Sequence, residues 1–265
     1  MNYIRSGFGV IALSVLCILS VLISDVSAND LILTPNNASI GNIVVVSPRA
    51  GSSATANGTA LLNTLAMIVD ASASNKYLIK LGPGTFNLGA SMLSMKQYVD
   101  IEGSGKELTV ITSSSDGTGT VHAGSTASRC TLRNLGINNT AATYAYAVYN
   151  NAGLLFLDNV AIDARYGASY NIGIFNDNSS LDMRNSGIVT LTPNGWAIYN
   201  SGTQYNNNQI FNSVLAGNDS QVYNSAGYGV DIAFTKLNTT STNFGAGVFR
   251  CFQNYNISFA PATCP

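Results

Sequence analysis

Charged side chains are scarce in this sequence. Only 9% of its 265 residues are Asp, Glu, Lys or Arg, against about 25% in an ordinary soluble domain. With a net charge of −1, the chain offers no cationic field to a phosphate backbone, so nucleic acid is not an expected partner. The single histidine leaves little scope for imidazole chemistry.

Neutral polar residues take the place of the missing charges. The chain contains 31 Asn and 25 Gly, which favour turns. Hydrophobic residues make up 46% of the sequence, enough to bury a sizeable core. This composition is typical of a folded, turn-rich β protein.

Residues 1–28 have the layout of a secretory signal. A positive charge near the N-terminus precedes the apolar run Gly7–Ile23, and Val26-Ser27-Ala28 has small residues at signal-peptidase positions. An uncleaved membrane anchor is the alternative, because this run stands at the short limit of a bilayer span. We expect cleavage, no stable membrane span afterwards, and a secreted, periplasmic, extracellular or cell-surface location for residues 29–265.

The exported chain would keep three cysteines in a compartment where disulfides persist. Cys251 and Cys264 enclose a short terminal loop, and a disulfide between them would hold the C-terminal end in place. Cys130 has no neighbour that would lower its thiol pKa, so we interpret it as a small buried hydrophobic residue.

Two sets of positions recur with one period. A motif of usually small, aliphatic and aromatic residues has its aromatic members 26, 24, 24 and 26 residues apart, at Tyr149, Phe175, Tyr199, Tyr223 and Phe249. A second set of apolar residues lies at Leu132, Leu157, Met183, Ile210 and Ile232. Two independent sets with a period near 25 predict a repeat protein.

The repeat is too short for paired helices, and its segments alternate as strands do. Leucine-rich repeats have a comparable period, but their leucine motif and helix are missing. We therefore predict an all-β solenoid of parallel strands, with about 25 residues per coil and Asn at the corners. Stacked Asn side chains would bond from coil to coil.

The N-terminal part differs from the repeats. Residues Thr59–Val69 place their apolar side chains on one helical face after Asn57-Gly58, which we interpret as a helix start. Such a helix would cap the first coil of the solenoid. We expect one domain with an N-terminal strand and this helix in 29–76, coils in 77–250 and a C-terminal cap in 251–265.

Three segments resemble the opening coils of the pectin-lyase-like superfamily, and most of all pectinesterase-type right-handed parallel β-helices. They are Tyr77–Phe86 (YLIKLGPGTF), Val99–Gly105 (VDIEGSG) and Thr109–Ile111. The resemblance implies a right-handed parallel β-helix capped by an N-terminal α-helix. It also suggests pectinesterase-like or pectate-lyase-like carbohydrate chemistry.

The catalytic motifs of that superfamily are missing. The sequence has neither the Gly-Thr-Val-Asp-Phe-Ile-Phe-Gly nor the Gly-Arg-Pro-Trp segment of pectinesterases. It also lacks the paired aspartates and the Gly-His-Gly of polygalacturonases. The chain would thus keep the scaffold without the known chemistry.

Asp158 is the strongest candidate for a catalytic acid. One place after the Leu132 set, the repeats read Arg133, Asp158 and Arg184, which would become vertical neighbours on an outward face. They would form either a clamp and acid–base group for a uronate, or a surface ion-pair ladder. We expect no metal site and no cofactor.

The aromatic set is the candidate substrate-binding site. Strand parity places Tyr149, Phe175, Tyr199, Tyr223 and Phe249 outside if their aliphatic neighbours point inside. This stripe would bind the apolar faces of a glycan or stabilise the solenoid by stacking, and the two roles are compatible.

The leading hypothesis is therefore a secreted protein for polysaccharide recognition or a cell-surface structural role. The alternative is a pectin-type esterase or lyase that acts on uronate-containing glycans. The sequence predicts no particular oligomeric state.

Overall fold

The computed structural model describes most of the chain from residue 32 onward. The described residues are 32–34, 42–124, 129–151, 153–190, 192–202, 206–238, 247–256 and 258–262. Residues Leu31–Pro265 form one compact unit. The predicted signal segment 1–28 and Cys264 lie outside the described residues.

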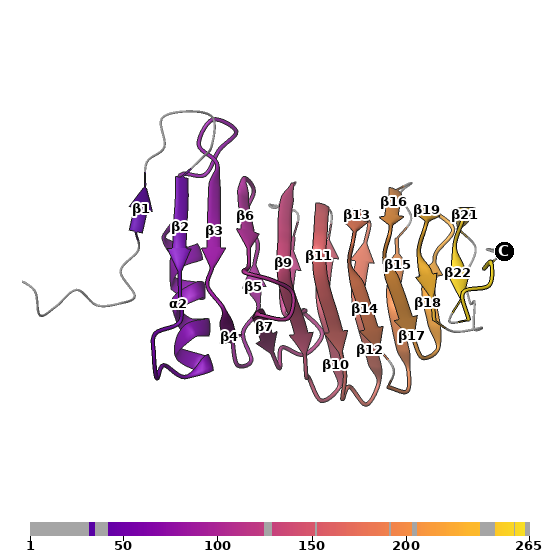
Figure 1. The fold of residues 1–265 in the computed structure, drawn as a ribbon, viewed down its shortest axis with the longest axis horizontal. Coiled ribbons are helices and arrows are strands. Elements are labelled where there is room, and N and C mark those ends of the chain that lie inside the picture. The colour runs from indigo at the N-terminus through magenta and orange to yellow at the C-terminus, as the bar shows by residue number, and fades with distance from the viewer. Residues whose placement is uncertain are drawn as a thin grey trace, which may run out of the picture. The chain divides into compact units, whose positions relative to one another are not determined.

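Two sheets make up this unit (Figure 1). The long sheet has sixteen strands: β1 (Ile32–Thr34), β2 (Asn42–Val46), β3 (Tyr77–Leu81), β4 (Gly84–Asn87), β6 (Val99–Glu102), β7 (Thr109–Ser113), β9 (Cys130–Asn139), β11 (Leu154–Ala164), β13 (Ser180–Arg184), β14 (Gly187–Thr190), β16 (Asn206–Phe211), β17 (Val214–Gly217), β19 (Tyr228–Ala233), β20 (Lys236–Leu237), β21 (Val248–Phe252) and β22 (Tyr255–Asn256). The aromatic sheet has six: β5 (Leu93–Ser94), β8 (Val121–Ala123), β10 (Tyr144–Asn151), β12 (Tyr170–Asp177), β15 (Gly195–Ser201) and β18 (Ser220–Asn224).

The predicted coils are confirmed by the strand register. Leu157 of β11 pairs with Leu132 of β9 and with Met183 of β13, so the chain returns to one column after 25 and then 26 residues. Ile210 and Ile232 continue this buried column. All pairings between the named strands are parallel except that of β1 with β2. The fold is the right-handed parallel β-helix that the sequence predicts.

A helix covers the N-terminal end of the stack. Helix α2 (Ala54–Met67) lies beside β2 and β4 (Figure 1) and buries Leu61 and Leu65 in the common core. Ser53 caps it, because its hydroxyl accepts a hydrogen bond from the Ala56 amide at 3.1 Å. The predicted helix is confirmed, but its start is five residues earlier than expected from Thr59.

Asn57-Gly58 is therefore not a start signal but a packing contact within α2. A Cβ atom on Gly58 would come within 2.0 Å of the Asn87 carbonyl oxygen, so only glycine lets the helix approach β4 this closely. The Asn57 amide donates to the Thr85 carbonyl at 3.1 Å. Packing against β4, and not a role in starting the helix, therefore explains why Asn57 and Gly58 stand at these positions.

Phe249 does not belong to the aromatic column, which corrects the prediction. It lies in β21 of the long sheet and pairs with Val230 of β19. This register places Arg250 beside Asp231, where the two side chains form an ion pair, and sets Cys251 on Ile232. The spacing from Val230 to Phe249 is 19 residues, so this coil is shorter than the earlier ones.

Asparagines turn the chain at one corner of successive coils, as predicted. Positive φ angles of 56°, 54°, 52° and 46° occur at Asn134, Asn159, Asn185 and Asn212. This is the left-handed region that Asn tolerates better than most residues. The amides also link the coils, since Asn159 donates to Asn134 at 2.9 Å and Asn212 donates to Asn185 at 2.8 Å.

A second asparagine ladder runs through the interior. Buried Asn150, Asn176, Asn200 and Asn224 follow the aromatic motif on successive coils. The first three each donate a side-chain amide to the next, at 2.7, 3.2 and 3.0 Å. Asn208 joins from β16 by donating to Asn200 at 2.8 Å. These bonds satisfy polar groups that burial would otherwise leave unpaired.

The ladder predicts a large cost for replacing its central member. Asn200→Ala removes the acceptor of two amides and the donor to Asn224, so the free energy of unfolding should fall by roughly 2–4 kcal/mol. The matched control, Asn218→Ala at an exposed corner, should cost less than about 0.5 kcal/mol. Urea unfolding measures both, and equal losses would contradict the ladder's role.

Candidate functional site

The outer face of the aromatic sheet holds one column of rings. Tyr149, Phe175, Tyr199 and Tyr223 pair in register through β10, β12, β15 and β18, and each is half-buried. Their aliphatic neighbours Val148, Ile174, Ile198 and Val222 are buried in the core. The predicted parity is confirmed for these four coils.

A second outer row was not predicted. Tyr146, Ile172, Trp196 and Ser220 pair in register three positions before the aromatic column. Tyr146 and Trp196 are half-buried, whereas Ile172 and Ser220 are buried. Strict alternation would turn these positions inward, but the strands bend between the two rows. In β10, Ala147 and Val148 are both buried, so Tyr146 faces outward again. The sequence did contain a signal for these outward rings. In two coils an aromatic residue occurs three positions before the aromatic column, as Tyr146 before Tyr149 and as Trp196 before Tyr199.

The rings stack on one another along the solenoid. Phe175 lies between Tyr146 and Tyr199, with centroid distances of 5.2 and 5.4 Å and interplanar angles of 16° and 9°. Tyr223 continues the stack from Tyr199 at 4.5 Å and 16°. Tyr149 instead stacks on His122 at 5.1 Å. The central rings turn their faces toward each other, which supports the stabilising role of the stack and leaves edges and hydroxyls outside.

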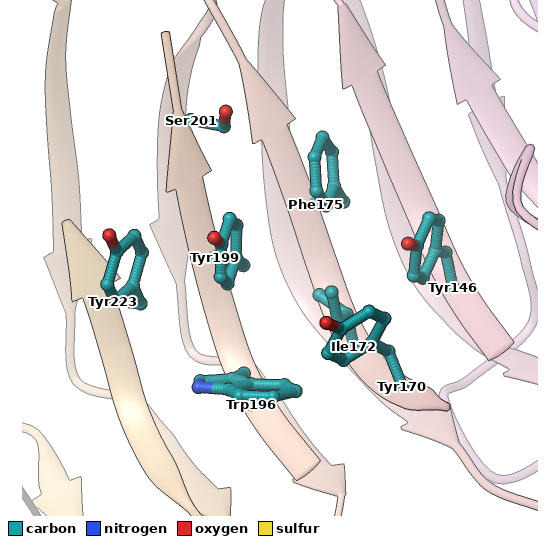
Figure 2. Close-up of a pocket in the computed structure, with 8 residues that line it drawn as sticks. All are labelled: Tyr146, Tyr170, Ile172, Phe175, Trp196, Tyr199, Ser201 and Tyr223. Atoms are coloured by element: carbon teal, nitrogen blue, oxygen red, sulfur yellow. The ribbon is translucent and has the colours of Figure 1, made fainter. Parts of the chain in front are cut away.

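A cleft of about 380 Å³ opens above Ile172, a small member of the second row. Ile172 lies between the much larger Tyr146 and Trp196 on the neighbouring coils, which leaves room above it. The lining residues, drawn in Figure 2, are Tyr146, Tyr170, Ile172, Phe175, Trp196, Tyr199, Ser201 and Tyr223. We call this space the aromatic cleft.

Trp196 forms one wall of the cleft. Its ring meets Tyr199 edge to face at 5.9 Å and 86°, and it tilts against Tyr170 at 5.3 Å. Figure 2 shows the indole across the line of stacked rings rather than within it. The cleft thus presents the edges of the stacked rings and one indole ring in a different orientation.

Two tyrosine hydroxyls of the cleft, those of Tyr146 and Tyr199, keep their protons over the physiological range. Burial, followed by the neighbouring tyrosines, raises the pKa of Tyr146 to about 12. Burial also raises the pKa of Tyr199. Burial lowers the pKa of His122, which favours its uncharged imidazole. The groups are therefore uncharged hydrogen-bond donors and acceptors.

The shifted pKa of Tyr146 predicts an alkaline loss of stability. The unfolded state ionises near pH 10, whereas folded Tyr146 keeps its proton until about pH 12, so its contribution is complete below pH 10 and is lost between these values. Tyr146→Phe should flatten this part of the stability curve, measured by urea unfolding from neutral pH upward. Tyr166→Phe, at a 66% exposed tyrosine, serves as the control. An unchanged slope in Tyr146→Phe would contradict the assignment.

The predicted triad lies in register on the long sheet. Asp158 pairs with Arg133 on one side and Arg184 on the other. The column extends as Lys80, Glu102, Arg133, Asp158 and Arg184, with charges that alternate in sign. Alternation of this kind offsets repulsion between coils that stand about 4.8 Å apart.

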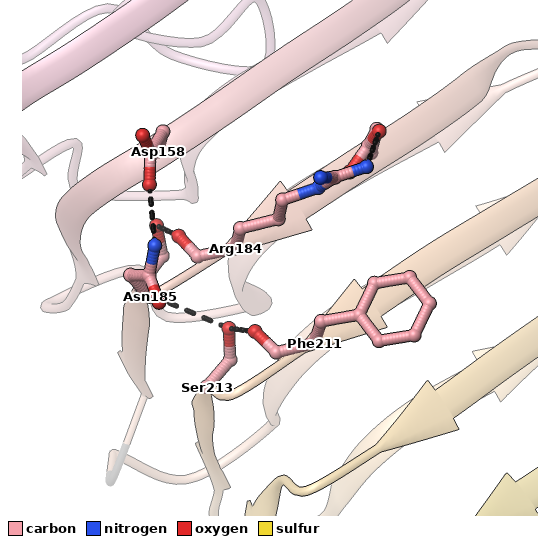
Figure 3. Close-up of polar contacts among 7 residues, drawn as sticks. Asp158, Arg184, Asn185, Phe211 and Ser213 are labelled. Carbon is pink, nitrogen blue, oxygen red and sulfur yellow. Dashed lines mark hydrogen bonds and ion pairs between the residues drawn. The ribbon is translucent and has the colours of Figure 1, made fainter.

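The three side chains of the triad form their hydrogen bonds and ion pairs with other residues. Arg184 makes two 2.9 Å bonds to Asp182, two positions earlier on the same face of β13. Arg133 pairs with Glu102 at 3.0 Å. Asp158 accepts a 2.7 Å bond from the Asn185 amide, and Figure 3 shows the Arg184 side chain extended away from it. A catalytic role for Asp158, Arg133 and Arg184 stays a prediction.

No cysteine is among the residues that line the aromatic cleft. Cys130 is buried, and burial raises the pKa of its thiol to about 12, which fits an inert hydrophobic residue. Because Cys264 lies outside the described residues, the Cys251–Cys264 disulfide stays a prediction. Within the described ranges, no three His, Cys, Asp or Glu side chains are grouped as metal ligands.

Within the same part of the chain, no helix has the length and apolar character needed to cross a membrane.

Comparison with known proteins yields structural similarity only. No protein-family model and no curated protein sequence matches the chain. A pectin methylesterase from carrot is 14% identical, with 85% of this chain and 86% of that chain covered and a TM-score of 0.49. A pectin methylesterase from Erwinia chrysanthemi is 12% identical (85% and 92% covered, TM-score 0.44). The A-module of a mannuronan C-5 epimerase from Azotobacter vinelandii is 13% identical (78% and 75% covered, TM-score 0.44). At these identities the similarity concerns the fold alone.

Proposed function

We propose that the protein binds a glycan chain in the aromatic cleft. The observation that carries this proposal is the lining of the cleft, in which six aromatic rings and Ile172 surround a space of about 380 Å³. A concave, mostly apolar site with a few polar groups is the usual form of a small-ligand site. We propose further that the chain is exported, with residues 1–28 as the signal.

The chemistry of the lining fits a sugar ring. A pyranose has apolar C–H faces and a rim of hydroxyls. The cleft offers the indole ring of Trp196, which lies across the stack, and the outward edges of the stacked rings, together with tyrosine hydroxyls, the indole N–H and the Ser201 hydroxyl. Tyr170 and Tyr144, 43% and 40% exposed, stack at 5.8 Å and extend the aromatic surface along the sheet. A chain laid across the coils would meet one ring after another.

Binding fits this site better than catalysis. Glycoside hydrolysis requires two carboxyl groups about 5–9.5 Å apart, and Asp177 is the one acidic residue in the six strands of the aromatic sheet. Asp158 lies on the long sheet, and both arginines of its column are paired with other acids. A pectin-type esterase or lyase remains the alternative proposal.

Two variants test the cleft. Trp196→Ala removes one wall, and Ile172→Phe fills the space without removing a ring. Each should weaken glycan binding about tenfold or more, which corresponds to ~1.4 kcal/mol. The matched control is Phe252→Ala, which removes a 59% exposed ring from the long sheet and should leave binding unchanged. Affinity electrophoresis in gels that contain single polysaccharides identifies a ligand, and titration calorimetry measures the affinities.

Circular dichroism serves to check that each variant is folded. Equal affinities of wild type, Trp196→Ala and Ile172→Phe for a bound polysaccharide would refute the cleft as the site. Turnover of that polysaccharide, abolished by Asp158→Asn, would support the enzyme alternative instead.

A further inference from the structure

We infer that the glycan bound in the aromatic cleft is uncharged, and that the cleft selects against the polyuronates that the sequence resemblance suggests. This inference rests on the proposed function and deepens it by naming the ligand class. It depends on the placement of charges relative to the cleft.

The aromatic sheet contains no cationic residue. Its six strands include neither Lys nor Arg. Between Arg133 and Lys236, a stretch that includes every residue lining the cleft, the sequence has only Arg165 and Arg184. A polyuronate carries a carboxylate on each sugar, and its recognition normally requires Arg, Lys or a bound cation.

Both of these arginines are bound to acids away from the cleft. Arg165 forms an ion pair with Asp163, which lies in β11 of the long sheet. Arg184 forms its two bonds with Asp182 within β13 of the same sheet. Neither residue lines the cleft.

The internal segments outside the described residues do not change this count. Residues 35–41, 125–128, 203–205 and 239–246 contain no Asp, Glu, Lys or Arg, and neither do the single positions 152, 191 and 257. Because the sequence places no charge in them, they supply no cation to the cleft.

The charge that borders the cleft is that of Asp177, and it is negative. Asp177, at the end of β12, pairs in register with Ser201 of the cleft lining. Its charge contributes to the raised pKa of the Tyr149 hydroxyl, after burial. Asp116 accepts a 2.7 Å bond from the Tyr144 amide, and Asp219 directly precedes β18. A carboxylate on the ligand would meet repulsion from Asp177, with no Lys or Arg among the residues that line the cleft to offset it.

The test compares glycans that differ only in charge. Fully methyl-esterified hexagalacturonate is uncharged, whereas its de-esterified form carries a carboxylate on each sugar. Hexasaccharides of glucose, galactose and mannose are each paired with the same chain oxidised at C6 to the uronate. Titration calorimetry at low and high salt measures the wild type, Asp177→Asn and Trp196→Ala.

In every pair whose neutral member binds, we expect the charged member to bind at least tenfold more weakly at low salt. This difference in affinity should shrink at high salt, because screening reduces the repulsion between the ligand's carboxylates and Asp177. Asp177→Asn should narrow the difference at low salt, while the affinity of the neutral chain stays within twofold.

Tighter binding of a charged member, weakened by salt and by Trp196→Ala, would overturn this inference and leave the cleft as a glycan site. The proposed function itself would be overturned by either of two results: no glycan binds, or the glycans bind but Trp196→Ala weakens none of them. The two failures are therefore distinguishable.

Discussion

Parallel pairing between successive coils determines which residue lies above which, and both surfaces of the solenoid depend on it. Pairing of Leu157 with Leu132 and Met183 builds the apolar column, and the same turns of chain place Tyr199 between Phe175 and Tyr223. Each coil buries its apolar face against its neighbours. Asparagine amides add a second set of coil-to-coil bonds in the core and at the corner. A register shift of one residue would move the buried side chains of a strand to the outer face and its outer side chains into the core.

The two sheets divide the chemistry between them. The long sheet holds the ion pairs at Arg133, Arg165, Arg184 and Arg250, all with partners on that sheet or its adjoining turns. The aromatic sheet holds stacked rings, hydroxyls and a single acid. The four ion pairs therefore lie away from the aromatic sheet, whose strands carry no Lys or Arg. This separation is what makes an uncharged ligand the best match for the cleft.

Repetition made most of the fold predictable. The columns through Leu157 and Tyr199, and the left-handed corners such as Asn159, follow from recurring letters at one spacing. Features that depend on a single contact could not be read in this way. The two buried residues Ala147 and Val148 in succession turn Tyr146 outward, and the shortened coil before Phe249 moves that ring to the long sheet. Arg184 bonds to Asp182 and not to Asp158. The Asp182 carboxylate, on the same strand, accepts two hydrogen bonds from the guanidinium.

Distances between spin labels on one outer column test the central claim most directly. The column from Lys80 through Asp158 to Phe252 advances one coil at each member, about 4.8 Å at a time. Double electron–electron resonance should place labels at Lys80 and Phe252 farther apart than labels at Asp158 and Phe252 by three coils, about 14 Å. All three positions are exposed, and the label arms contribute equally to both pairs. Equal distances for the two pairs would contradict the stacked register.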